Sequence, residues 1–286
     1  MPFPPDVFLI GAQKAGTTTL AEILDSHPGV TLSDPKEPHF FTKNLHLGWD
    51  WYRECFPGGE DKILVDASTS YAAGPLDEGR RGIPLDGVPE LIHEVRPEAK
   101  FIYMVREPVS RTYSAYWHDV RLGLEDLPFW EALEREPMYL ELSDYAAQLR
   151  KYLELFDLES FAVLTFEEFK DDPVGVANRC FELMGLETLA PEEIPELHKN
   201  RSYTYSKAGR VIFQVLGGAE NLDRIYRWAS RAIPEGAQRK LKSLMTKEIP
   251  PMEEWQRKRL EHYFMPKNAE LRRLTGLDTG YPEART

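Results

Sequence analysis

The amino-acid sequence predicts a single α/β domain in which helices flank a mainly parallel central sheet and a P-loop-like turn follows the first strand. Short apolar runs of strand length alternate with amphipathic helical stretches, a pattern typical of parallel sheets covered on both faces. The 286 residues, of which 42% are hydrophobic, suffice for one large core. We therefore expect one domain over residues 1–286, with a core at about residues 5–215 and a helical C-terminal part at about residues 216–286.

The first expected strand is the unbroken apolar run at residues 7–10, and a glycine-bounded loop follows it. From Thr17 onward, apolar residues recur at helical spacing, which predicts a helix. A loop rich in proline and glycine is expected at residues 74–90. Further strands are expected at residues 29–32, 63–66, 100–105 and 161–166. Further helices are expected at residues 91–95, 109–120, 129–157, 174–184, 252–264 and 268–274.

The loop after the first strand has the features of an anion site. Gly11 and Gly16 permit a tight turn, and the following helix directs backbone N–H groups and its positive end towards a ligand. The second glycine is followed by Thr17, where a P-loop NTPase has lysine, and the lysine of this loop is Lys14. A purely structural turn would show the same glycine spacing. The lysine and the three threonines that end at Thr19 favour a phosphate-like ligand.

A second candidate anion site follows the strand at residues 100–105. Arg106 ends that strand, and Ser114 lies two turns into the next helix, so a guanidinium and a hydroxyl could bind one phosphate. The alternative is an arginine paired with Glu107 and a serine that faces solvent. Ligands of such sheets bind beyond the carboxyl ends of the strands, where the polar residues 66–70 also lie.

A third cluster, at residues 36–41, places Glu37 and His39 beside two phenylalanines. Glu37 could be a surface carboxylate paired with Lys36, and His39 could be a core histidine. The histidines of the chain lack the spacing of metal ligands, and we expect no metal site. The aromatic residues at 49–56 are compatible either with the wall of a pocket or with core packing.

Charge and cysteine content limit the classes of partner. The formal net charge of −12 disfavours nucleic acid and long polyanionic ligands, and favours a small or neutral one. The N-terminus lacks the features of a signal peptide, and no apolar run is long enough to span a membrane. Cys55 and Cys180 are too few for a disulfide framework. These observations favour the cytoplasm.

Together the motifs resemble those of the sulfotransferases that use 3′-phosphoadenosine-5′-phosphosulfate (PAPS). Residues 14–20, KAGTTTL, look like the 5′-phosphosulfate loop of that family, and residues 105–116, VREPVSRTYSAY, look like its 3′-phosphate motif. Residues 166–169, the Asp-Pro at 172–173 and the helix end at 184–186 also fit its pattern, so the resemblance spans roughly residues 5–215. The stretch KEPHFF at residues 36–41 is similar to the branch that contains heparan sulfate sulfotransferases and many bacterial enzymes.

The resemblance implies a role for each motif residue. Glu37 would be the general base on an acceptor hydroxyl, His39 would orient the acceptor or the base, and Lys14 would stabilise the leaving phosphate. PAPS would be the donor and adenosine 3′,5′-bisphosphate the product, without a metal. The residues implied to bind the cofactor are Lys14, Ala15, Gly16, Thr17, Thr18, Thr19, Arg106 and Ser114, with Lys207, Gly209 and Arg210 in a late cofactor loop that could alternatively be a solvated basic loop.

Two departures from the heparan sulfate enzymes concern the acceptor. The chain has Ala67 where those enzymes have a lysine, and Thr42 where the 3-O type has an acidic residue. With the acidic net charge, these favour a small-molecule, lipid or carbohydrate alcohol over a heparan-like polymer. The alternatives are a P-loop-type nucleotide kinase or NTPase and a non-catalytic nucleotide-binding module. The sequence leaves open the identity of the acceptor, O- or N-sulfation, the oligomeric state and whether residues 74–90 gate the site.

Overall fold

The computed structural model describes residues 3–76, 85–194, 204–205 and 246–282. The chain divides into two compact units, which are described separately below. The first unit comprises Met1–Thr112, Pro137–His198 and Lys258–Thr286, and the second comprises Tyr113–Glu136 and Lys199–Arg257.

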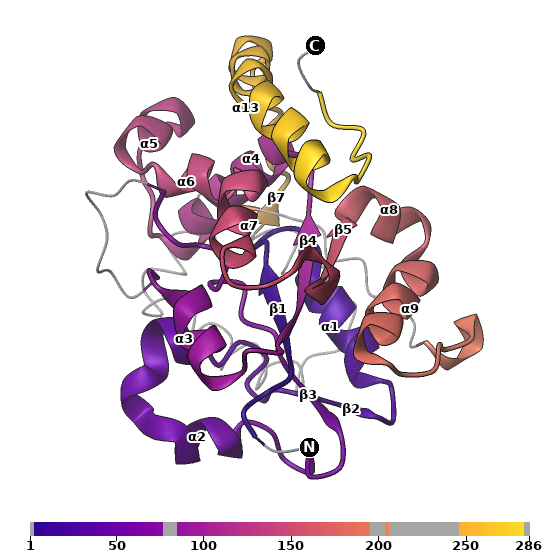
Figure 1. The fold of residues 1–286 in the computed structure, drawn as a ribbon. Helices are drawn as coiled ribbons and strands as arrows, with labels where there is room; N and C mark the ends of the chain where they lie inside the picture. The colour runs from indigo at the N-terminus through magenta and orange to yellow at the C-terminus, as the bar shows by residue number, and fades with distance from the viewer. Residues whose placement is uncertain (1–2, 77–84, 195–203, 206–245, 283–286) are drawn as a thin grey trace, which may run out of the picture. The chain divides into compact units, whose positions relative to one another are not determined.

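A five-stranded sheet forms the centre of the first unit, in the order β2-β3-β1-β4-β5, with parallel pairing between all neighbours (Figure 1). All of β1 is buried, as is all of β4 except its first residue. Burial on both faces explains why these strands read as unbroken apolar runs, and it confirms the predicted α/β class. The strands are β1 (Val7–Gly11), β2 (Val30–Leu32), β3 (Ile63–Asp66), β4 (Lys100–Val105) and β5 (Phe161–Thr165).

Helices account for most of the remaining described chain in both units. The α-helices are α1 (Thr17–Asp25), α2 (Gly48–Glu54), α3 (Val88–Val95), α4 (Pro108–Leu122), α5 (Phe129–Arg135), α6 (Met138–Glu141), α7 (Tyr145–Leu153), α8 (Phe166–Asp171), α9 (Pro173–Met184) and α13 (Glu254–Thr275). The shorter turns are the π-helix η1 (Phe40–Asn44) and the 3₁₀ helices η2 (Leu45–Leu47), η4 (Leu158–Ser160) and η5 (Pro191–Glu193). None of the described helices is long and apolar enough to cross a membrane. In the second unit, β6 (Thr204–Tyr205) pairs antiparallel with β7 (Thr246–Lys247).

The helices differ from the expected ones. α2 and α8 were not expected, and α3 begins at Val88, inside the stretch expected as a loop at residues 74–90. Two further differences involve prolines. Residues 129–157, expected as one helical stretch, contain α5, α6 and α7, because Pro137 interrupts the first run and Asp144 starts a new helix by accepting the Ala147 N–H at 3.2 Å. Conversely, the two helices expected at 252–264 and 268–274 form the single helix α13, which continues through Pro266. The sequence-based break at that proline was wrong.

Aromatic side chains pack across β1, β4 and β5 near the amino-terminal ends of these strands. Phe101 on β4 lies between Phe8 on β1, with ring centroids 5.9 Å apart, and Phe161 on β5, at 4.7 Å. Both pairs are stacked, and both of these distances lie within the range of favourable aromatic contacts. This row joins three neighbouring strands below the sheet edge that carries the candidate site.

Candidate active site

Three strand ends at which the sequence shows notable polar residues are neighbours in the sheet. The strand order places β1 between β3 and β4, and all three run parallel. Their carboxyl ends therefore share one edge of the sheet, where ligands of this fold class bind. The loop with Lys14 follows β1, the polar residues from Asp66 onward follow β3, and Arg106 follows β4.

The loop after β1 requires glycine at position 16. Gly16 has a left-handed φ of 88° and is the N-cap of α1, and Lys14 also has a positive φ, of 72°. A Cβ atom on Gly16 would lie only 2.7 Å from Cδ2 of Phe166, so the ring of Phe166 packs directly on this backbone. The N-terminus of α1 thus points its backbone N–H groups into the loop. Of the other loop residues, Ala15 and Thr17 are buried, Thr18 is exposed and Thr19 is half-buried.

Arg106 contacts the same loop. Its Nη1 donates a hydrogen bond to the carbonyl oxygen of Lys14 at 3.0 Å, and its guanidinium lies 5.0 Å from the centroid of the Phe166 ring. The carboxylate of Glu107, which the alternative interpretation paired with Arg106, instead accepts the N–H groups of Val109 and Ser110 at 2.9 and 2.8 Å. Glu107 therefore caps α4, and Arg106 is oriented by the loop and the aromatic ring.

Ser114 lies on α4 in the second unit and is only 7% exposed, which contradicts the expectation that a serine here could face solvent. Its hydroxyl has no hydrogen-bond partner among the described residues. A buried hydroxyl without a partner is costly, and an external anion would satisfy it. Lys207, Gly209 and Arg210, the predicted late cofactor loop, lie outside the described residues.

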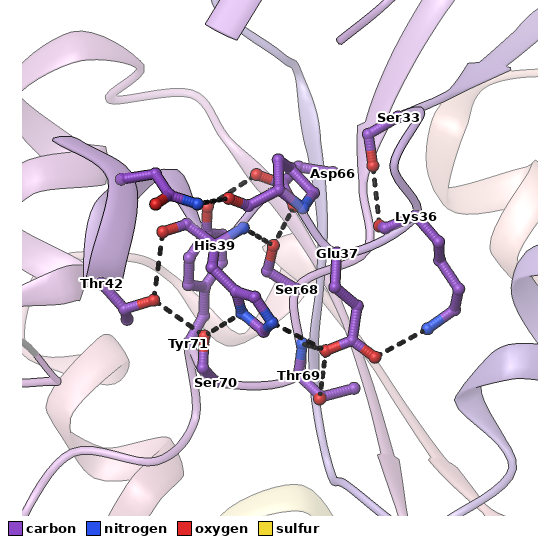
Figure 2. Close-up of polar contacts among 12 residues, drawn as sticks. Ser33, Lys36, Glu37, His39, Thr42, Asp66, Ser68, Thr69, Ser70 and Tyr71 are labelled. Atoms are coloured by element: carbon purple, nitrogen blue, oxygen red, sulfur yellow. Dashed lines mark hydrogen bonds and ion pairs between the residues drawn. The ribbon is translucent and has the colours of Figure 1, made fainter. Parts of the chain in front are cut away.

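Glu37 lies in the segment between β2 and η1 and is held from three sides (Figure 2). Its Oε2 accepts the Thr69 hydroxyl at 2.8 Å and the Thr69 N–H at 3.4 Å, and its Oε1 accepts from the Lys36 ammonium at 3.1 Å. Burial alone would raise the pKa of Glu37, but the Lys36 charge, the hydrogen bonds from Thr69 and Lys36, and His39 together lower it below its usual 4.5. Glu37 is therefore an ionised carboxylate at neutral pH.

His39 faces Glu37 across a short gap. Its Nε2 lies 3.6 Å from Oε2 of Glu37, and its Nδ1 is 2.8 Å from the Ser70 hydroxyl, which is itself 2.9 Å from the Thr42 hydroxyl (Figure 2). Burial, and then the positive charges of Lys43 and Lys36, lower the pKa of His39 against the opposing effect of Glu37. The imidazole is therefore neutral at neutral pH, and its ring is fixed by hydroxyl groups on the side away from Glu37.

A buried carboxylate anchors the backbone of this segment. Asp66 is fully buried and accepts from the hydroxyls of Ser68 at 2.6 Å, Tyr52 at 2.6 Å and Tyr71 at 2.7 Å. The same Ser68 oxygen accepts the His39 N–H at 2.9 Å, and the Tyr71 oxygen accepts the N–H of the second phenylalanine, residue 41, at 3.3 Å. Burial raises the pKa of Asp66 to about 6 despite the three donors.

Arg106 directly follows β4, as the sequence predicted, but sequence reasoning did not assign Thr69, Ser70 or the Asp66 cluster. The available signal was the run of three hydroxyl-bearing residues at 68–70, one position after the buried strand that ends at Asp66. Nothing in the sequence indicated that Tyr52 contacts Asp66. It is fully buried, stacks on the Phe40 ring at 4.0 Å and donates to Asp66, so this part of the 49–56 aromatic stretch is core.

The sulfotransferase domain family model matches residues 4–249 of the chain. The chain belongs to this family. The match includes β1, the Glu37 segment and the Arg106 segment, and it makes the chain a member of a family of sulfotransferase enzymes. The predicted family resemblance is therefore confirmed. Asp66, a weak sequence candidate for the magnesium ligand that an NTPase needs, instead accepts hydrogen bonds from three hydroxyls. Among the described residues, no group of three or more His, Cys, Asp or Glu side chains is arranged to hold a metal ion.

Relatives of this sulfotransferase include carbohydrate-modifying enzymes and a bacterial protein. Heparan sulfate glucosamine 3-O-sulfotransferase 3A1 from Mus musculus is 28% identical over 200 residues, covering 66% of this chain and 48% of that protein. Heparan sulfate glucosamine 3-O-sulfotransferase 3B1 from Homo sapiens is 24% identical over 288 residues, covering 97% of this chain and 65% of that protein. The chain thus spans about half to two thirds of the length of these relatives. A sulfotransferase structure from Alicyclobacillus acidocaldarius has a TM-score of 0.66 and 25% identity, covering 97% and 98% of the two chains.

Proposed function

We propose that this sulfotransferase transfers a sulfuryl group from PAPS to an acceptor hydroxyl, with Glu37 as the general base. The observation that carries the proposal is the ionised Glu37 carboxylate, hydrogen-bonded to Thr69 and facing His39. A base must be ionised and held in place to take a proton from an alcohol at neutral pH. Glu37 follows β2, and the loop of Lys14 follows β1, which lies two positions away from β2 in the sheet order.

The described residues fit a donor that carries two anionic groups. The glycine-bounded loop and the N-terminus of α1 suit a 5′-phosphate. In the first unit, the Arg106 guanidinium suits a 3′-phosphate. In the second unit, the buried Ser114 hydroxyl has no hydrogen-bond partner among the described residues and would be satisfied by an anion. PAPS supplies the activated sulfuryl group when it is bound.

In the proposed reaction, the acceptor oxygen forms a bond to sulfur while the bond between sulfur and the bridging oxygen of the donor breaks. The electron pair of that bond stays on the released 5′-phosphate, where the Lys14 ammonium offsets the developing charge. The acceptor proton moves to Glu37. His39, as a neutral imidazole beside Oε2 of Glu37, orients the base or the acceptor hydroxyl. The protein therefore contributes positioning and electrostatics, as in phosphoryl transfer.

For the acceptor, we propose a small-molecule, lipid or carbohydrate alcohol without a dense negative charge. The net charge of −12 disfavours a polyanion. Ala67 is fully buried, so no side chain at that position reaches an acceptor. Thr42, at the position of an acidic residue in the 3-O type, is 5% exposed and bonds Ser70 inside the protein. Transfer of labelled sulfate to heparan sulfate in preference to neutral alcohols would contradict this choice.

Replacing Glu37 with glutamine tests the role of the base. Glu37→Gln is expected to lower the transfer rate about 10²- to 10⁴-fold while the affinity for adenosine 3′,5′-bisphosphate stays unchanged, because the amide cannot accept the proton. Glu22→Gln, on the exposed face of α1, is the matched control. Turnover at the wild-type rate in Glu37→Gln would exclude this base. Binding of ATP with Mg²⁺ but not of the bisphosphate by the wild-type protein would exclude the donor.

A further inference from the structure

Both polar atoms of the peptide group that joins Arg106 to Glu107 are bound by side chains from other helices. The Tyr145 hydroxyl on α7 donates to the Arg106 carbonyl oxygen at 2.8 Å. The Glu107 N–H donates to Oε1 of Glu167 on α8 at 3.2 Å. A peptide plane tied at both its carbonyl and its N–H has little freedom to rotate. The direction in which the Arg106 side chain leaves the backbone is thereby set by two distant parts of the chain.

The start of α8 contacts Arg106 a second time. Phe166 precedes Glu167, and its ring lies 5.0 Å from the Arg106 guanidinium on one side and against Gly16 on another. A guanidinium over an aromatic face is attracted to it, so the ring supports the flat face of the arginine. The first two residues of α8 thus orient both the backbone and the side chain of Arg106, and any shift of this helix end would move the arginine.

The C-terminal segment holds that helix end in place. The second carboxylate oxygen of Glu167, Oε2, accepts a hydrogen bond from the Tyr281 hydroxyl at 2.9 Å, and Tyr281 is only 6% exposed. Next along the chain, the Pro282 carbonyl oxygen accepts from Nδ2 of Asn268 on α13 at 2.6 Å. In Figure 1 this segment is the yellow chain that follows α13. Burial, with Tyr145 and Glu167 nearby, raises the pKa of Tyr281, so its hydroxyl keeps its proton and donates.

We propose that Tyr281 is a positioning residue of the donor site, which acts through Glu167 to fix the orientation of Arg106. Without the Tyr281 hydroxyl, Oε2 of Glu167 would lack its hydrogen-bond donor and would rotate towards solvent. The hydrogen bond between Oε1 of Glu167 and the Glu107 N–H would then be lost. The peptide group would then be held only by Tyr145. This inference rests on the proposed role of Arg106 at the 3′-phosphate. It implies that the C-terminal segment with Tyr281 contributes to the affinity for the donor.

The test is calorimetric titration of the full-length protein with adenosine 3′,5′-bisphosphate. Tyr281→Phe keeps the buried ring and removes only the hydroxyl. We expect its dissociation constant, and the KM for PAPS, to rise about fivefold, as for the loss of part of a hydrogen bond to a charged group. The kcat at saturating donor and the KM for the acceptor should not change. Thr275→Val is the matched control, because it removes another C-terminal hydroxyl, which bonds the Leu271 carbonyl at 2.8 Å.

A double-mutant cycle shows whether the effect passes through Glu167. Glu167→Ala should weaken bisphosphate binding at least as much as Tyr281→Phe, and the double variant should be no weaker than Glu167→Ala. Wild-type affinity in either single variant overturns the inference. Equal losses in Tyr281→Phe and Thr275→Val, or additive losses in the double variant, also overturn it, since they indicate general loosening of the segment. If the wild-type protein itself does not bind the bisphosphate, the proposed donor fails instead.

Discussion

Replacing Asp66 with asparagine is expected to change how the free energy of unfolding depends on pH. Asp66 is fully buried, and burial raises the pKa of its carboxyl from 3.8 to about 6. The hydroxyls of Ser68, Tyr52 and Tyr71 all donate to it and oppose that rise without cancelling it. The folded protein therefore holds an ionised carboxylate at neutral pH at a cost in stability.

The sign follows from the two pKa values of Asp66. Below pH 3.8 both the folded and the unfolded carboxyl are protonated, and the group favours neither state. Between 3.8 and about 6 the folded state binds the proton more tightly, so stability decreases as the pH rises. Above about pH 6 the carboxyl is ionised in both states, and the free energy of unfolding no longer changes with the titration of Asp66. A difference of about two pKa units corresponds to a free energy of about 3 kcal/mol, as an order of magnitude.

Urea unfolding of the wild type and of Asp66→Asn between about pH 4.5 and 7.5 measures this effect. Relative to the variant, the wild type should lose most of that ~3 kcal/mol as the pH rises. The difference between the two curves is the readout, because it cancels the titration of all other groups. Asp50→Asn, at a carboxylate whose side chain is 98% exposed on α2, is the control. Curves for wild type and Asp66→Asn that stay parallel within about 0.5 kcal/mol would refute the reasoning.

Two further substitutions test the loop and the base. Gly16→Ala should lower the free energy of unfolding by about 2 to 4 kcal/mol, because the left-handed φ and the contact with Phe166 both oppose a Cβ atom, and an unchanged urea midpoint would contradict this. Thr69→Val removes a hydrogen bond that stabilises the ionised form of Glu37, so the acidic limb of the kcat/KM profile should move to higher pH. An acidic limb at the wild-type position would show that Thr69 does not hold the base.

The parts that the sequence predicted well are those whose physical cause is local. Residues 7–10 and 100–105 are unbroken apolar runs because their strands are buried on both faces, and that burial is visible in the sequence. The glycine-bounded loop was also readable, since φ at Gly16 and the turn into α1 depend on a few adjacent residues. The ends of helices were harder to predict from the sequence. Pro137 interrupts a helix and Pro266 does not, and this difference depends on the tertiary context of each proline.

The supports of the candidate site could not be predicted, because they join residues that are far apart in the chain. Asp66 gathers hydroxyls from two different segments, and one of them belongs to Tyr52, on α2. The hydrogen bond between Tyr281 and Glu167 spans 114 positions. No spacing rule connects such pairs. Motif reading can therefore propose groups that would touch the donor and the acceptor, but it offers no means to identify the groups that orient them.

The chemistry of a carboxylate explains what the buried Asp66 contributes to the segment despite its cost in stability. A carboxylate only accepts, so Ser68 and Tyr71 must point their hydrogens towards it and offer their lone pairs to the N–H groups of His39 and Phe41. An amide would present an NH₂ group to some of these hydroxyls, reverse at least one of them and leave a backbone N–H facing another donor. Asp66→Asn should therefore slow sulfuryl transfer even at a pH where its stability equals that of the wild type, as expected when stability is given up for a fixed active-site geometry. A full transfer rate in that variant would show that the ionised carboxylate is not needed to orient the segment.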